Sequence, residues 1–553
     1  MSKVLSGPRA MFFIGGKVPA ARSGSVEEMG FKAFNLDAMA ACGLPVPPAF
    51  VLSTGFCRAQ QSAGGGPGSP LREALAEGIR HIERESGMSF GGRRRPLLVS
   101  VRSGAAVSMP GMMETVLDVG VNDLTVDAII RSTGNPRLAW DCYRRLVQGF
   151  AEVVHGGPSE PFDRLLETCM RTSGAASPRE IDFRSLAALT HDFLALFIEQ
   201  TGAPFPQDPI VQLEAATLAV LRSWQAPKAV SYRNARGIDQ AMGTAVTVQR
   251  MVFGNAGGLS GAGVAFTRNP STGENQLYMD FLFNAQGEDV VSGRHALEGE
   301  LPLGKLLPEV MEQLGQVSLT LEEGFRDAQE FEFTIEDATL FMLQTRSAKR
   351  TPWASLRIVV EQVESGLISP GEALARLQGI DLASVAELSF ARPEELELLA
   401  TAVPAGIGIA VGRIALDIDT AERLAAGGDN VVLVRAETAT ADIAGIVACA
   451  GILTSVGGRT SHAAVVARQL GKVCLMDCHD LELDVSARRC RFASRELREG
   501  DWLCLDGNSG RVFAGKPAVI SRRPDELLHM VTRWQRELSP GPDSDAKGVA
   551  QAA

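Results

Sequence analysis

Apolar and polar residues follow different patterns in different parts of the chain. Up to residue 350 strand-like and helix-like patterns alternate, whereas residues 351–400 have apolar positions at helical spacing, as in Ala354–Ser365 and Pro370–Leu377. From Pro404 onward, short apolar runs bounded by turn residues are typical of buried strands. These predicted strands are Val431–Arg435, Gly451–Thr454, Val473–Met476 and Trp502–Leu505.

The patterns predict an α/β and α+β multidomain protein in four parts. Residues 1–350 form a mixed domain, 351–400 a helical connector, 401–516 a second mixed domain, and 517–553 a short helix (Pro524–Leu538) with a disordered tail. Within the first part, Ala63–Pro70 is a predicted loop and Gly91–Pro96 a predicted basic turn.

Composition narrows the class of protein. A chain of 553 residues should hold three or four domains at ~150 residues each. Its net charge of −11 argues against general nucleic-acid binding. No apolar run is long enough to span a membrane, and Met1–Ala10 lacks a signal-peptide core. We therefore expect a cytoplasmic protein that binds neither nucleic acid nor membrane.

Nine scattered cysteines indicate thiols in a reducing compartment. Cys474, Cys478 and His479 lie close together in the sequence. No second ligand pair follows them, and Cys474 falls inside a predicted strand, so packing is favoured over a zinc site.

One histidine stands at a predicted helix start. His462 follows two glycines, Thr460 and Ser461, and precedes the compact apolar run Ala463–Leu470. Backbone N–H groups at a helix start attract phosphate, and a neutral imidazole there could attack phosphorus and carry the phosphoryl group. A cap on a structural helix is the alternative reading, and for a lone histidine it is the better one.

Other stretches suit a bound polyphosphate. Arg102 follows an apolar run and precedes a glycine-containing loop, which indicates a phosphate cradle or, alternatively, a surface ion pair. The strand predicted at Val246–Phe253 has peptide edges that could bind an adenine ring, or it is a core strand.

A pair of strands, Glu330–Thr334 and Leu340–Arg346, joined by a turn at 336–338, carries the third set of polar groups. Alternation puts Glu330 and Glu332 on one side of the first strand. Gln344 and Arg346 share one side of the second, and the two pairs are expected on one face. Such a set suits Mg²⁺ with polyphosphate, although a solvated sheet face is the more economical reading of this stretch alone.

Together these stretches resemble the pyruvate, phosphate dikinase family, in order and with similar spacing from about residue 30 to about residue 515. The motifs that carry the resemblance are Gly43–Pro48, Ser100–Thr115, Arg137–Arg145, Val248–Asn255, Gly263–Pro270, Asn284–Val290, Leu343–Arg350 and Gly451–Gly471. The resemblance implies an ATP-grasp nucleotide domain over 1–350 and a swivelling phosphohistidine domain over 401–516. It also implies ATP and Mg²⁺ as cofactors.

The resemblance assigns roles residue by residue. His462 is implied to be the phosphorylated residue and Arg102 the triphosphate-binding arginine. The implied nucleotide positions are Lys32, Gly111, Thr115, Gln249, Met251, Glu330, Glu332, Gln344 and Arg346, with Glu332 and Gln344 also as metal ligands. Thr460 matches a regulatory phosphorylation site of plant relatives.

The nucleotide lysine has two candidates. Gly15-Gly16-Lys17 looks like the family motif, but only Lys32 has the expected spacing to Gly43, so the role goes to Lys32. Phe31 and Ala33 stand where the family has glycines, and Glu330 stands where an aspartate is usual. The loop around Lys32 is therefore bulkier than in the family.

The resemblance ends near Gly515, and a barrel of about 250 residues does not fit in the remainder of this sequence. The expected activity is phosphorylation of His462 by ATP, followed by transfer to pyruvate, forming phosphoenolpyruvate, on a separate barrel-domain protein. Phosphate is a further expected substrate, and a homodimer is one expected assembly. The alternatives are a phosphoenolpyruvate synthase-like enzyme, another phosphohistidine phosphotransferase, or a non-catalytic regulator of a full-length dikinase.

Overall fold

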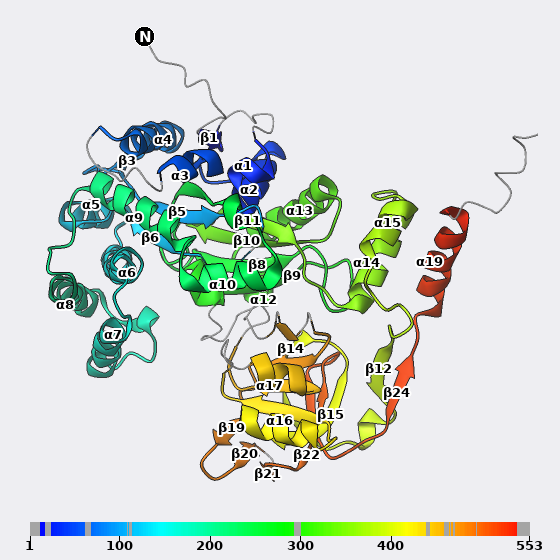
Figure 1. Cartoon of the computed structure of the whole chain (residues 1–553). Coiled ribbons are helices and arrows are strands. Elements are labelled where there is room, and N and C mark those ends of the chain that lie inside the picture. The colour runs from blue at the N-terminus through cyan, green and yellow to red at the C-terminus, as the bar shows by residue number, and fades with distance from the viewer. Residues whose placement is uncertain are drawn as a thin grey trace, which may run out of the picture. The chain divides into compact units, whose positions relative to one another are not determined.

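The computed structural model describes residues 11–16, 24–60, 68–107, 109, 113–291, 300–437, 443–457, 464, 466–467, 470–493 and 495–538. They fall into two compact units. Figure 1 labels the helices and strands along the chain. Unit 1 comprises Met1–Ala262, Phe283–Gln286 and Phe331–Thr345, and unit 2 comprises Gly263–Leu282, Gly287–Glu330 and Arg346–Ala553. The expected α/β multidomain fold is confirmed.

The N-terminal part of the chain alternates short strands with helices, as the sequence pattern predicts. Its strands are β1 (Met11–Ile14), β2 (Ala49–Leu52), β3 (Ser89–Phe90), β4 (Pro96–Leu97), β5 (Val99–Gly104), β6 (Thr115–Val119) and β7 (Ala245–Arg250). Its helices are α1 (Val26–Met29), α2 (Phe31–Ala41), α3 (Thr54–Gln60), α4 (Pro70–Ser86), α5 (Asp123–Thr133), α6 (Pro136–His155), α7 (Glu160–Ser173), α8 (Phe183–Thr201), α9 (Pro209–Ser223) and α10 (Pro227–Arg236), with 3-10 turns at Pro178–Glu180 and Gln240–Met242.

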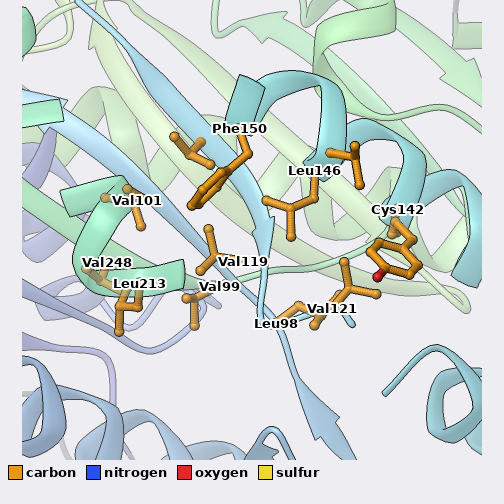
Figure 2. Packing of buried hydrophobic residues seen from close by; sticks show 14 of the residues in the cluster. Leu98, Val99, Val101, Val119, Val121, Cys142, Leu146, Phe150, Leu213 and Val248 are labelled. Carbon is orange, nitrogen blue, oxygen red and sulfur yellow. The ribbon is translucent and has the colours of Figure 1, made fainter. Parts of the chain in front are cut away.

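A five-stranded sheet in the order β1-β2-β7-β5-β6 is the framework of unit 1. One face of it carries valines that pack against helices α6 and α9; Figure 2 shows Val101, Val119 and Val248 gathered with Leu146 and Phe150. Burial of these apolar side chains is the main favourable term in folding. Because strand residues alternate between faces, the intervening positions point to the opposite side of the sheet.

A second sheet has four strands in the order β11-β10-β8-β9. Its strands are β8 (Gly261–Phe266), β9 (Tyr278–Phe283), β10 (Gln329–Glu336) and β11 (Thr339–Ser347), and the helices near them in sequence are α11 (Gly287–Val291), α12 (Glu300–Leu306) and α13 (Pro308–Phe325). Strands β10 and β11 confirm the pair expected from alternation. Their turn has Asp337 at φ 47° and Ala338 at φ 59°, and positive φ at both central residues is the conformation that two-residue hairpin turns favour.

The connector expected at 351–400 is helical only as far as Arg376. Helix α14 (Pro352–Glu364) is preceded by the N-cap residue Thr351, whose side chain accepts from the Ala354 N–H, and a capping box precedes α15 (Pro370–Arg376). Two strands follow that the sequence pattern missed, β12 (Glu387–Phe390) and β13 (Leu398–Thr401), separated by a 3-10 turn at Pro393–Glu395. Strand β12 pairs with β24 (Val519–Arg522), a partner too distant in sequence for local patterns to reveal.

The four strands predicted after Pro404 are confirmed within an eight-stranded sheet in the order β13-β23-β22-β15-β16-β17-β18-β14. The four are β16 (Val431–Arg435), β17 (Gly451–Thr454), β18 (Val473–Met476) and β22 (Trp502–Asp506). They are joined in the sheet by β13, β14 (Val403–Gly406), β15 (Ile409–Ala415) and β23 (Arg511–Ala514). Helices α16 (Ile418–Ala426) and α17 (Ile443–Ala448) contribute to the apolar cluster on one face, and a small sheet of β19 (Glu482–Asp484), β20 (Arg489–Phe492) and β21 (Arg495–Arg498) contributes to the cluster on the other. Cys474 lies buried within β18, as expected.

The last helix is α19 (Asp525–Leu538), which confirms the predicted short helix and packs with α14 and α15 in one apolar cluster. The tail expected beyond Leu538 lies outside the described residues, as does most of the Ala63–Pro70 loop. Pro70 itself is the first residue of α4 rather than a loop residue. None of the described helices is both long and apolar enough to cross a membrane.

Candidate functional site

Arg102 lies in a row of polar residues across three strands of the five-stranded sheet. In the strand register it stands opposite Thr115 on β6 and opposite Thr247 on β7. The neighbouring row, Val101 with Val116 and Val248, belongs to the apolar core. Since side chains alternate, Arg102, Thr115 and Thr247 share the face that points away from that core.

This row has the character of an anion site. Arg102 is half-buried and, within the described part of the chain, has no carboxylate partner. Thr247 is 4% exposed and its Oγ1 has no hydrogen-bond partner. A guanidinium and two hydroxyls supply the donors that phosphate oxygens accept. The surface ion pair that was the alternative for Arg102 is not found among the described residues.

Thr247 was missed by the sequence analysis. Only its register with Arg102 identifies it, because Val246-Thr247-Val248 has the pattern of an ordinary alternating strand. Gly111, assigned to the same loop as Thr115, lies outside the described residues. The described end of that loop is fixed by Glu114, whose N–H donates to Ser223 Oγ at 3.4 Å and whose carboxylate pairs with Lys228 at 2.6 Å.

The strand predicted at Val246–Phe253 does not have exposed peptide edges in its first part, which is a correction to the prediction. Strand β7 is the central strand of the sheet and pairs with β2 and β5 as far as Arg250. The Gln249 side chain is buried and donates to the Pro47 carbonyl at 3.3 Å, and the Met251 N–H donates to the Leu98 carbonyl at 2.9 Å. The Gln249 amide therefore supports the sheet, and the role of Gln249 and Met251 with a nucleotide stays a prediction.

The segment after β7 is held by an acidic residue that the sequence did not reveal. Glu336 accepts from the Phe253 N–H at 3.0 Å and pairs with Arg250 at 3.1 Å. Burial raises the pKa of the Glu336 carboxyl, and the Arg250 guanidinium opposes that rise. The two contacts fix the chain on either side of Met251 to the end of β10.

Lys32 is exposed and sits in the first turn of α2. The start of this helix lies against the end of β5, since the Phe31 N–H donates to the Ala105 carbonyl at 2.8 Å. Gly30 makes this approach possible, because a Cβ at that position would lie 2.0 Å from the Gly104 carbonyl oxygen. Lys17, the rejected candidate, lies outside the described residues.

The carboxylates and the arginine predicted on the hairpin are partly brought together. Glu330 is 5% exposed and forms an ion pair with Arg346. The buried positions of β11 are Leu340, Met342 and Thr345, so its alternation shifts by one residue before Thr345. This shift fits Arg346 lying on the face of Glu330, as the ion pair requires.

Glu332 and Gln344 are half-exposed. Within the part of the chain that the structure describes, neither side chain has a hydrogen bond or ion pair with protein. A carboxylate and an amide oxygen of this kind are ligands that Mg²⁺ accepts beside phosphate oxygens.

His462 and Thr460 lie outside the described residues, so their predicted roles are not tested by geometry. Beside them, Ala464, Val466 and Ala467 are helical, in agreement with the predicted helix. Ala464 and Ala467 are both fully buried and belong to the cluster on one face of the eight-stranded sheet.

Two stretches of the chain match known protein families. The family model described as the pyruvate phosphate dikinase AMP/ATP-binding domain matches residues 67–300, and that of the mobile domain of PEP-utilising enzymes matches residues 427–510.

Three similar curated proteins are dikinases. Pyruvate, phosphate dikinase of Rhizobium meliloti (strain 1021) is 41% identical over 96% of this chain and 61% of its own length. Pyruvate, phosphate dikinase 2 of Zea mays is 41% identical over 89% of this chain and 56% of its own. The Clostridium symbiosum enzyme is 40% identical over 88% and 56%. The chain thus spans less than two thirds of each relative.

Proposed function

Because this chain matches the AMP/ATP-binding domain of pyruvate phosphate dikinase and the mobile domain of PEP-utilising enzymes, we propose that it is an ATP-dependent phosphotransferase that phosphorylates its own His462. The phosphoryl group then passes to pyruvate, forming phosphoenolpyruvate, on an acceptor domain supplied in trans. The reaction draws on ATP and inorganic phosphate, and we place it in the cytoplasm.

The observation that carries the proposal is the row formed by Arg102, Thr115 and Thr247. A half-buried guanidinium without an acidic partner among the described residues, flanked by a buried unsatisfied hydroxyl, lacks a counter-charge. Buried charges are normally paired. A triphosphate would supply both the negative charge and the acceptor oxygens that this row lacks.

In the proposed reaction the three phosphoryl groups of ATP end in AMP, on His462 and in pyrophosphate. The imidazole of His462 attacks the β-phosphorus of ATP, and the bond from that phosphorus to the AMP oxygen breaks. AMP leaves, and the imidazole carries a pyrophosphoryl group. Inorganic phosphate then attacks the γ-phosphorus of that group, the bond from the γ-phosphorus to the bridging oxygen breaks, and pyrophosphate leaves while the β-phosphoryl group stays on His462. Arg102 and Lys32 hold the phosphate oxygens and offset the charge that accumulates on them.

Glu332 and Gln344 would hold Mg²⁺. Their oxygens fit this ion, since both side chains are half-exposed and have no protein partner within the described residues. The ion would neutralise charge on the phosphate oxygens of ATP. Arg346, which pairs with Glu330, is assigned a further phosphate contact.

The acceptor domain is proposed to lie on another polypeptide. The relatives are longer than this chain, which spans 61% of the Rhizobium meliloti protein. Adding a separately produced barrel domain of a relative with pyruvate should yield phosphoenolpyruvate if the acceptor acts in trans. A requirement for inorganic phosphate separates dikinase chemistry from that of a water-using synthase, and ATP binding without AMP release would instead indicate a regulator.

The phosphorylation step is tested with radiolabelled ATP. Wild-type protein incubated with β-labelled ATP, Mg²⁺ and phosphate should gain acid-labile, base-stable label, whereas γ-labelled ATP should leave no label on the protein once phosphate is present. His462→Ala should gain none, because no other group in the proposal accepts the phosphoryl group. Absence of label on the wild type, or equal label on His462→Ala, overturns the proposal.

A further inference from the structure

Asn35 connects two parts of unit 1 that are far apart in the sequence. It lies on α2, is 5% exposed, and its side-chain amide donates to the main-chain carbonyl of Thr345 at 2.9 Å. Thr345 follows Gln344 on β11. A second bond lies nearby, from the Met342 N–H to the Pro45 carbonyl at 2.9 Å. Helix α2 and the loop after it are therefore bonded to β11, an edge strand of the four-stranded sheet.

Helix α2 is thus fixed at two points. Its first turn lies against the end of β5 through the Gly30–Gly104 approach and the bond from Phe31 to Ala105. Its second turn is fixed to β11 by Asn35. Lys32 lies between these points and precedes Asn35 by three residues, so the two side chains project from neighbouring positions of the helix surface.

We infer that Asn35 is a positioning residue that aligns Lys32 with the strand carrying Gln344. The inference rests on the proposed function, in which Lys32 binds phosphate oxygens of ATP. Only the amide donor performs this role, since the Thr345 carbonyl is an acceptor. Asn35 itself is buried, and no contact with the nucleotide is assigned to it.

The side chains of the two residues that flank Lys32 make such an alignment necessary. Ala33 is 1% exposed and Phe31 is half-buried. Neither can supply the close backbone approach to phosphate that glycine allows. The side chain of Lys32 then has to reach the phosphates from a helix that is held rigidly in one place, because small displacements of a binding group cost large factors in rate.

The test compares binding of ATP–Mg²⁺ with binding of AMP by calorimetry. Asn35→Ala should weaken ATP binding by about tenfold and leave AMP binding unchanged, because AMP lacks the β- and γ-phosphates that Lys32 contacts. The Lys32→Met, Asn35→Ala double variant should bind ATP no more weakly than Lys32→Met alone, since Asn35 acts through Lys32. The rate of His462 labelling at saturating ATP should also fall by about tenfold in Asn35→Ala.

Asn122 provides the matched control. It is 4% exposed, and its side-chain amide likewise donates to a main-chain carbonyl, that of Gln207, at 2.7 Å. Asn122→Ala should keep the wild-type ratio of ATP to AMP affinity even where it lowers stability. Asn35→Asp should behave as Asn35→Ala at neutral pH, because an ionised carboxylate cannot donate to the Thr345 carbonyl.

An unchanged ATP-to-AMP affinity ratio in Asn35→Ala overturns the inference. A double variant that binds ATP more weakly than Lys32→Met alone overturns it as well. These outcomes are distinct from failure of the proposed function. If the wild type gains no label yet binds ATP, the proposed reaction fails, while the affinity ratio still decides the role of Asn35.

Discussion

Asp141→Ala is expected to lower the free energy of unfolding by about 3–5 kcal/mol, the cost of removing one partner from a buried ion pair. The Asp141 carboxylate bonds Arg144 at 2.8 Å, Arg145 at 3.1 Å and the Asn255 amide at 3.2 Å. The side chains of Asp141 and Arg144 are only 3% and 5% exposed. Without the carboxylate, the Arg144 guanidinium would stay buried without a counter-charge.

The loss of stability in Asp141→Ala should depend on pH. Burial raises the pKa of Asp141, but Arg145, Arg144 and Arg137 lower it by more, so the net pKa is well below its usual value. A carboxyl with a lowered pKa stabilises the fold above its unfolded pKa of about 3.9 and loses this contribution as the pH falls below it. The gap in stability between wild type and Asp141→Ala should therefore be widest near neutrality and shrink in acid.

Urea unfolding of both proteins at neutral and acid pH measures these differences. Asp192→Ala is the control, because Asp192 lies on the next helix but one and is exposed, so a change within about 0.5 kcal/mol is expected. A loss of stability in Asp141→Ala no greater than in Asp192→Ala would show that the buried cluster does not stabilise the protein.

Gly30→Ala is expected to slow labelling of His462 by at least about tenfold and to destabilise the protein by about 1–3 kcal/mol or more. Gly30 has φ 77° and ψ 154°, a conformation in which side chains other than hydrogen are strained. The added Cβ would also lie 2.0 Å from the Gly104 carbonyl oxygen. Either α2 or the end of β5 must move, and these elements carry Lys32 and Arg102.

Gly243→Ala separates the conformational cost from the steric one. Gly243 has a similar backbone conformation, φ 74° and ψ −175°, but the nearest atoms to its added Cβ would be those of the flexible Arg58 side chain, at 3.2 Å. Gly243→Ala should lose stability while retaining most of the labelling rate. Equal labelling rates for the two alanine variants would contradict the importance of the contact between α2 and β5.

The sequence pattern predicts well those elements whose apolar residues form a clear run within the element itself. Strands β16, β17, β18 and β22 and helices α14 and α15 lie where the apolar runs place them, because each run is bounded by turn or capping residues. Strands β12 and β24 were missed, since they form a two-stranded pair joining distant segments and β24 is exposed along its length.

The candidate site is predictable only where its residues share a strand. Alternation indicates that Glu330 and Glu332 lie together, but the shift in β11 that fits Arg346 lying beside Glu330 depends on tertiary packing. Thr247 and Asn35 carry no local signal. Each is identified by a partner in another segment, Arg102 in one case and Thr345, 310 residues away, in the other.

The central claim is that this chain transfers a phosphoryl group from ATP to His462, and peptide mapping by mass spectrometry at neutral to alkaline pH tests it most directly. After incubation with ATP, Mg²⁺ and phosphate, the peptide that contains His462 should carry one phosphoryl group on the imidazole, with one AMP released per group. An unmodified peptide, or a phosphoryl group on another residue, would contradict the account.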